Sequence, residues 1–78
     1  MLTFEYDKKD EFLMIHGDAD GLQFLQTQIK SLLNSAEKGA MNHLHLMSTE
    51  WGGSELTSQK QTNDENVEVL NHVKIFCW

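Results

Sequence analysis

The sequence has a single cysteine, Cys77, no proline, and no long hydrophobic segment. With one thiol the chain cannot form an internal disulfide, which fits a protein of a reducing compartment. No apolar run approaches the roughly 20 residues that span a bilayer. The first residues, MLTFEYDKKDEF, lack the basic segment and apolar run of a signal peptide. We therefore expect a cytoplasmic protein that does not act at a membrane.

Basic residues are also scarce, with 6 lysines and arginines against 12 acidic residues and a formal net charge of −6. An acidic chain repels phosphate backbones, so a nucleic-acid partner is not expected. A basic protein partner suits this charge better, because opposite fields speed encounter, although plain solubility also explains an acidic composition. The 78 residues are enough for one domain, residues 1–78, with a small core and modest stability.

Two segments near the N-terminus have the pattern of β-strands. Residues 2–7 (LTFEYD) alternate between apolar and polar side chains, which predicts a half-buried strand. Residues 11–17 (EFLMIHG) are apolar on both faces, which predicts an interior strand. The polar DKKD between them predicts a turn, so we expect an antiparallel hairpin.

Helical spacing follows the hairpin. Asp18 is a suitable N-cap, apolar residues recur at intervals of three and four between Leu22 and Ala36, and Gly39 is a natural terminator. This pattern predicts a helix of roughly 18 residues. Gly21 weakens the first turn, and we expect it there because it lets the helix approach the sheet closely.

The C-terminal half contains two further strand-like segments. In residues 41–48 (MNHLHLMS) two leucines share one face, and two histidines share the other. Residues 67–78 (VEVLNHVKIFCW) are predicted to form one strand, and residues 49–66 a loop that is tightest at Gly52–Gly53. The predicted fold is α+β in the order ββαββ, a small, largely antiparallel four-stranded sheet with one helix on one face.

This fold leaves apolar surface without a cover. One helix covers only one face of a sheet, yet the second and fourth strands carry large apolar side chains on both faces. The second face could be covered by a second copy of the chain, by a different protein, or by the 49–66 loop with Trp51 as its anchor. We favour a homodimer or a partner interface, and the free edges of a small sheet also allow pairing.

The strongest chemical signal is the pair His43 and His45. In a strand both side chains point the same way, roughly 7 Å apart, and could share a metal ion. A third ligand would have to come from elsewhere in the chain, from His16, His72, Glu50 or Glu55. A His-x-His pair without thiol ligands is more typical of an interfacial face, so we expect no metal and no cofactor.

Catalytic signals are weak. Cys77 has no preorganised neighbours in the sequence, and Ser48, Glu50, Ser54 and Glu55 flank a flexible turn. We therefore assign no catalytic residue and expect no enzymatic activity. The WGG motif that begins at Trp51 predicts a tight turn, and its aromatic side chain either packs on the core or contacts a partner as a hot spot.

The segments HGDADGLQFLQTQIKSLL and NHLHLMSTEWGGSELT together resemble a family of bacterial immunity proteins from polymorphic toxin systems, the immunity protein 32 family. The resemblance covers roughly residues 13–57. The residues that carry it are Gly17, Asp18, Gly21, Leu22, His43, His45, Trp51, Gly52, Gly53, Glu55 and Leu56. It implies a small cytoplasmic protein that binds and neutralises a toxin domain, and thus an inhibitor rather than an enzyme.

We therefore predict a binding module whose partner is a cognate toxin, and the acidic balance favours a basic nuclease toxin. The residues predicted at or near the binding surface are His43, His45, Trp51 and Glu55, with Glu50 as a charge at its rim. One alternative is a homodimeric structural or regulatory domain whose second sheet face is the dimer interface. Another is a His-based metal-binding module.

Overall fold

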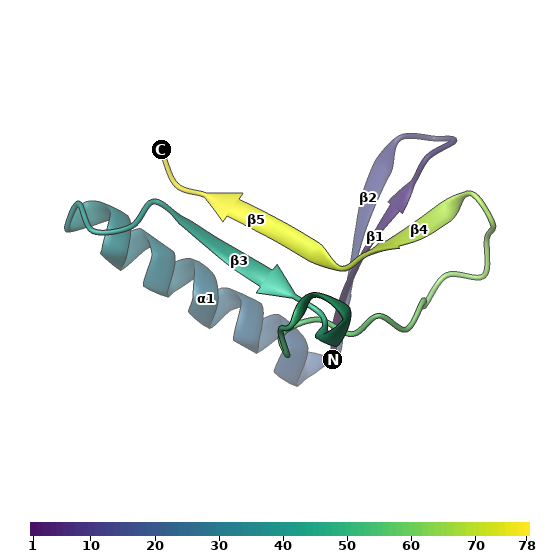
Figure 1. Cartoon of the computed structure of the whole chain (residues 1–78), viewed down its shortest axis with the longest axis horizontal. Helices are drawn as coiled ribbons and strands as arrows, with labels where there is room; N and C mark the ends of the chain where they lie inside the picture. The colour runs from purple at the N-terminus through teal and green to yellow at the C-terminus, as the bar shows by residue number, and fades with distance from the viewer.

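A computed structural model describes all residues of the chain, Met1–Trp78, and shows one helix and five strands (Figure 1). In chain order the elements are β1 (Leu2–Asp7), β2 (Phe12–Gly17), α1 (Ala19–Glu37), β3 (His43–Met47), the short 3-10 helix η1 (Thr49–Trp51), β4 (Val67–Leu70) and β5 (His72–Phe76). The predicted α+β class is confirmed. No helix combines the length and the apolar character needed to cross a membrane.

The predicted four-stranded sheet is wrong, because the strand expected over residues 67–78 is broken at Asn71 into β4 and β5. The strands form two antiparallel sheets, one in the order β2-β1-β4 and one that pairs β3 with β5 (Figure 1). Ser48 fixes the break: its backbone N–H donates to the Asn71 carbonyl at 2.9 Å, and its buried hydroxyl lies 2.8 Å from the Asn71 side-chain oxygen. The order is therefore ββαβββ.

The predicted burial of the first two strands is also reversed. β1 is the central strand of its sheet, and both of its faces are buried, including Thr3, Glu5 and Asp7. β2 is an edge strand, and Phe12 on one face and Ile15 on the other are about half exposed. Alternating polarity predicted a half-buried β1, but backbone N–H groups that donate to the buried carboxylates of Glu5 and Asp7 make a fully covered strand possible.

The predicted hairpin and helix start are confirmed. β1 and β2 pair antiparallel, with Leu2 opposite Gly17 and Asp7 opposite Phe12. The Asp18 carboxylate caps α1 by accepting the Gly21 N–H at 2.8 Å. A Cβ at Gly21 would overlap the carbonyl of Met1, so this glycine allows the close approach of α1 to the start of β1.

The core lies between α1 and both sheets. Its buried cluster consists of Leu2, Phe4, Leu46 and Leu56, with partly buried side chains packed around it: Phe24, Leu25, Leu44, Leu70, Val73 and Ile75. The leucine row of β3 thus faces the helix, as its alternation predicted. α1 buries only part of its apolar surface, since Leu22, Ile29 and Leu33 stay about half exposed.

The second face of the three-stranded sheet is covered by the chain's own loop. Glu5, whose side chain is 0% exposed, accepts the backbone N–H groups of Gln61 at 2.5 Å and Thr62 at 3.2 Å. Its carboxylate also lies 3.2 Å from Nε2 of His16. The loop before β4 runs beside this sheet (Figure 1). For this sheet, a segment of the 49–66 loop therefore lies over Glu5, as the less favoured expectation had it. The expected anchor was wrong, because Trp51 is 60% exposed and lies against His72 of the other sheet.

Candidate protein-interaction surface

The second face of the β3–β5 sheet carries the predicted histidines. The register pairs His43 with Phe76, His45 with Lys74, and Met47 with His72. Side chains of directly opposed residues share a face, so these six lie together. The residues between them, Leu44, Leu46, Val73 and Ile75, belong to the core or pack against it.

Aromatic rings form a continuous row on this face. Adjacent ring centroids are 5.3 Å apart for Trp51 and His72, 5.1 Å for His72 and His45, 5.1 Å for His45 and His43, 5.3 Å for His43 and Phe76, and 5.5 Å for Phe76 and Trp78. We define the aromatic row as the six residues Trp51, His72, His45, His43, Phe76 and Trp78. Such spacing lies within the range of favourable aromatic contacts, so the row is a preformed surface.

The aromatic row stays open to solvent. Trp51 is 60% exposed and Phe76 46%, and the 57–62 segment that covers the other sheet is tied to Glu5. An exposed group of large aromatic side chains on a small protein usually marks a place of interaction. The row is therefore the part of the surface best suited to a partner.

The imidazoles of His45 and His72 are hydrogen-bonded to each other, with 2.8 Å between Nδ1 of His45 and Nε2 of His72. One ring donates and the other accepts, so at least one nitrogen of the pair carries no proton. Loss of hydration lowers the pKa of His45, and the neighbouring His72, Lys74 and His43 lower it further. His45 is therefore a neutral imidazole at pH 7.

Glu50 lies next to Trp51 in η1. One of its oxygens is 2.8 Å from the Ser48 hydroxyl, and the other accepts the Ser58 hydroxyl at 2.8 Å. These bonds lower the pKa of Glu50, and the bond from Ser58 has the largest effect. Its carboxylate is thus ionised and held by its own chain at the Trp51 end of the row.

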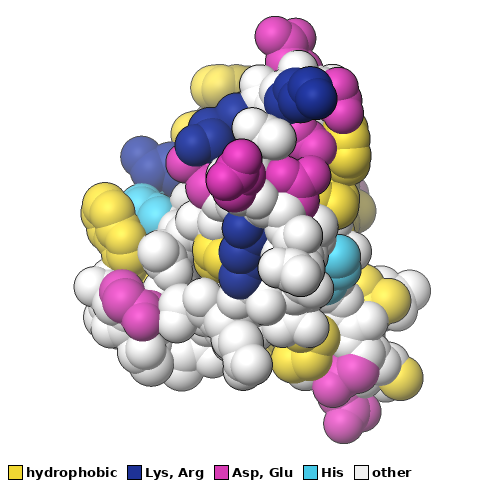
Figure 2. Space-filling view, turned by 90° about the vertical axis from the view of Figure 1, so that its right-hand side faces the viewer, with side chains coloured by type: hydrophobic (Ala, Val, Ile, Leu, Met, Phe, Trp, Pro, Cys, Tyr) yellow, Lys and Arg dark blue, Asp and Glu magenta, His cyan; other side chains and the backbone are white.

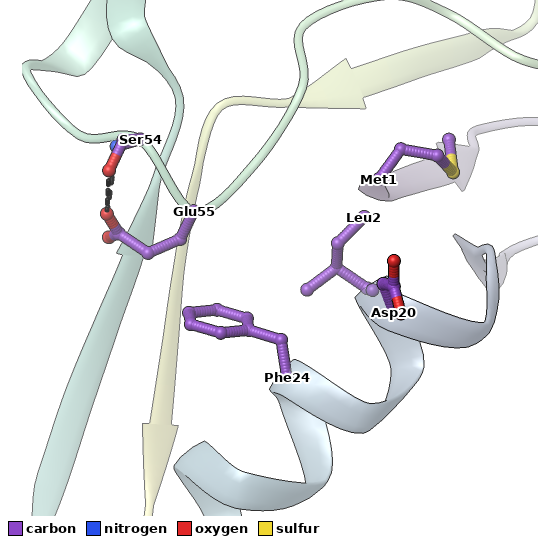
Figure 3. Close-up of a pocket in the computed structure, with 7 residues that line it drawn as sticks. Met1, Leu2, Asp20, Phe24, Ser54 and Glu55 are labelled. Carbon is purple, nitrogen blue, oxygen red and sulfur yellow. Dashed lines mark hydrogen bonds between the residues drawn. The ribbon is translucent and has the colours of Figure 1, made fainter.

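Glu55 lies outside the aromatic row. Its carboxylate accepts the backbone N–H of Ser54 at 2.8 Å and that of Met47 at 3.2 Å, and the bond from Ser54 is the largest cause of its lowered pKa. The side chain lines a pocket of about 250 Å³ at the start of α1, with Phe24 and Asp20 from the helix (Figure 3). In this place Glu55 fixes the turn that follows Gly52.

The geometry also bears on a metal ion. His43 and His45 share a face as predicted, and His72 adjoins His45, but His16 belongs to the other sheet beside Glu5. No three side chains of His, Cys, Asp or Glu are grouped so that they could hold one ion. The facing nitrogens of His45 and His72 are instead engaged with each other in a hydrogen bond of 2.8 Å.

Sequence reasoning missed three members of the surface as site residues: His72, Phe76 and Trp78. Their common face on the last strand was visible from the alternation, but their place beside the histidines was not. That place depends on the register of β3 with β5. The sequence did show histidines in both segments, and aligning these segments as antiparallel neighbours would have brought the histidines together.

Comparison with known families gives one finding. The family model described as Immunity protein 32 matches residues 13–73. The match extends from β2 into β5, so it includes three histidines of the row and Trp51 and ends before Phe76. No curated protein and no solved structure matches the chain.

Proposed function

The chain belongs to the immunity protein 32 family, and from this premise we propose that it binds a cognate toxin and neutralises it in the cytoplasm without chemistry of its own. An immunity role follows from the family in general. The direct toxin contact and the residues that make it are our proposal.

The aromatic row is the observation that carries this proposal. Interface hot spots are enriched in large aromatic side chains that become fully desolvated on binding. Trp51 and Phe76 are exposed, and the imidazoles between them are in contact with one another and with the rings at both ends. A preformed surface loses little side-chain entropy when a partner binds. We assign His43, His45 and Trp51 to the toxin contact, with Phe76 added.

The two glutamates have different parts in this proposal. Glu50, beside Trp51, is a charge at the rim, already held by Ser48 and Ser58. Glu55 positions the turn through its bonds to the backbone of Met47 and Ser54 and does not itself touch the toxin. Rim charges change association rates more than final affinity.

Co-expression with the toxin encoded by the neighbouring gene tests the proposal. We expect the wild-type chain to rescue growth and to form a stable complex. Phe76→Ala should weaken the complex by about 30-fold or more, as hot-spot truncations do. Phe12→Ala is the matched control, because Phe12 on β2 is 45% exposed and Phe76 46%. Absence of a complex and of rescue would reject the function. Equal effects of the two variants would reject the surface.

A homodimer is the second candidate, and a specific observation favours it. The edge strand β2 contains neither lysine nor proline, residues that commonly protect free edges. Apolar side chains on β2 are half exposed. Leu22 of α1, also half exposed, lies next to Gly17 at the end of β2, so it adjoins this strand. Light scattering at micromolar concentration tests this candidate, and a particle of 9.0 kDa would reject it.

A further inference from the structure

The charge of the aromatic row differs from that of the whole chain. The chain has a formal net charge of −6, but neither β3 (HLHLM) nor β5 (HVKIF) contains an acidic residue. His43, His45, His72 and Lys74 share one face of these strands, with Lys74 directly opposite His45. The exposed face of this sheet is therefore a place where one lysine and three protonatable imidazoles come together without a carboxylate side chain.

Acidic side chains concentrate elsewhere. On the side of the three-stranded sheet and the 57–66 loop, they are mixed with lysines over the upper part of the molecule (Figure 2). At the row itself, Glu50 stands at the Trp51 end, and its two oxygens are already engaged by hydroxyl groups. Lys74 is thus the fixed positive charge on this face, and the imidazoles can gain positive charge next to a carboxylate, within a molecule that repels negative charge at longer range.

We propose that the aromatic row receives an acidic segment of the toxin, with Asp or Glu carboxylates against the imidazoles and Lys74, and with apolar side chains of that segment on Trp51 and Phe76. This inference rests on the proposed function and specifies the chemistry of its contact. It differs from the expectation drawn from net charge, because binding senses the charges at the contact rather than their sum over the chain.

A protein segment fits this surface better than a nucleic acid. A nucleic acid presents regularly spaced phosphates far beyond one short sheet, and these would meet the acidic remainder of the molecule. A short acidic segment of a protein, by contrast, can be confined to the length of the row. Its side chains also supply apolar contacts for the exposed indole and phenyl rings.

The geometry makes this contact sensitive to protons. His43 on its own strand, and His72 and Lys74 on β5, face His45, and in the free protein their positive charge disfavours a proton on it. A carboxylate placed among these groups reverses the balance and stabilises the protonated rings. Formation of the complex should therefore take up protons, and the toxin should bind more tightly at pH 6 than at pH 8.

Charge reversal in the toxin complex tests the inference. Lys74→Glu should lower the affinity at least about tenfold, whereas Lys30→Glu, the same charge change on exposed α1, should change it less than about threefold. Titration calorimetry at pH 7 in phosphate and in imidazole buffer, whose ionisation enthalpies differ, should show net proton uptake that His45→Gln reduces.

The outcomes separate the two proposals. A complex that Lys74→Glu strengthens, or that both lysine variants change equally, would overturn the acidic contact and leave the immunity function standing. Complex formation without proton uptake would also overturn it. A labelled poly(U) oligonucleotide that binds the wild type but not Lys74→Glu would overturn it in favour of a nucleic-acid partner. If the toxin forms no complex with the wild type, both proposals fail.

Discussion

The two sheets of the molecule differ in what lies over their second faces. On the three-stranded sheet the central strand places Thr3 and Glu5 on this face, and both are buried where residues 57–62 of the same chain cover it. On the β3–β5 sheet this face is aromatic, and it remains exposed. Polar side chains of a central strand are thus buried in one sheet, and aromatic side chains are exposed in the other, the reverse of the usual relation between polarity and burial.

The difference shows that the chain covers a polar face where it can supply hydrogen-bond partners for the buried groups. A buried carboxylate needs fixed donors, and the loop provides two backbone N–H groups and brings Thr62 to Glu5. Aromatic rings need no particular donor and tolerate water, so the row can stay open until a partner covers it. Exposed groups of large aromatic side chains are typical of interaction sites, and the proposed function rests on this property of the row.

Adjacent residues of β3 give the largest expected contrast between covered and open faces. Leu46 is 1% exposed in the core, and Leu46→Ala should lower the free energy of unfolding by about 3 kcal/mol. His45→Ala, one residue away on the open face, should leave stability close to that of the wild type and weaken toxin binding instead. Urea denaturation measures the first effect and calorimetry the second. Similar stability losses in both variants would show that the row is part of the core.

The cover of the polar face depends on Glu5. Glu5→Gln keeps the shape of the side chain, but its NH2 group replaces one of the two oxygens that accept the Gln61 and Thr62 N–H groups, and the charge beside His16 is lost. The substitution should cost about 2 kcal/mol in urea unfolding. Glu68→Gln is the matched control, because Glu68 lies on β4 of the same sheet and makes only an exposed ion pair with Lys8 at 3.9 Å. Such a pair contributes about 0–1 kcal/mol.

The same substitution should release the loop. In Glu5→Gln, trypsin should cut after Lys60 faster than in the wild type, because Gln61 and Thr62 lose their charged acceptor. Equal cleavage rates would mean that other contacts, such as the bond from Thr57 N–H to the Leu2 carbonyl at 2.9 Å, hold the loop in place.

Local parts of the fold were predictable from the sequence because their causes are local. The Asp18 cap and the β1–β2 hairpin depend on neighbours within a few residues. The central position of β1 was not predictable, because the donors that bury Glu5 lie 56 and 57 positions away. The break at Asn71 was missed for a similar reason. Leu70 and Val73 both pack against the core, so the alternation shifts by one residue at Asn71. The contact with Ser48 that holds the bend comes from 23 positions away.

The candidate site shows the same division. That His43 and His45 share a face followed from the period of a strand. That His72 and Phe76 extend the row followed only from the register of two strands distant in sequence. Glu55 was predicted at or near the binding surface; the chain turns at Gly52, where φ is +84°, and Glu55 lines the pocket at the start of α1. The direction of a turn is not encoded by the presence of glycine alone.

Acid should act on the two regions in separate ranges of pH. The pKa of His45 is lowered from its ordinary value of 6.5, so the unfolded chain binds more protons there, and stability should fall as the pH drops below that value. Burial raises the pKa of Glu5, but hydrogen bonds from Thr62 and Gln61 and the charge of His16 leave it below 4.5. Its stabilisation is therefore present above pH 4.5 and lost at lower pH.

Urea unfolding between pH 8 and pH 3 measures both ranges. His45→Gln should remove the decline that begins near neutral pH and leave the acid one. Glu5→Gln should do the reverse. If either variant changed both declines, the two faces would be coupled rather than independent.

Substitutions at two glycines should have the smallest effects on stability, and only one of them should change toxin binding. Gly39 after α1 and Gly52 after η1 have φ of +70° and +84°, and a Cβ at either would meet no atom within 4 Å. Alanine at each position therefore adds backbone strain without a clash, and we expect both Gly39→Ala and Gly52→Ala to lower stability by about 1 kcal/mol. Only Gly52 adjoins Trp51, so only Gly52→Ala should shift the indole against His72 and weaken the toxin complex. Equal binding by the two variants would show that the turn at Gly52 shapes the fold but not the contact, and would move the hot spot from Trp51 toward Phe76.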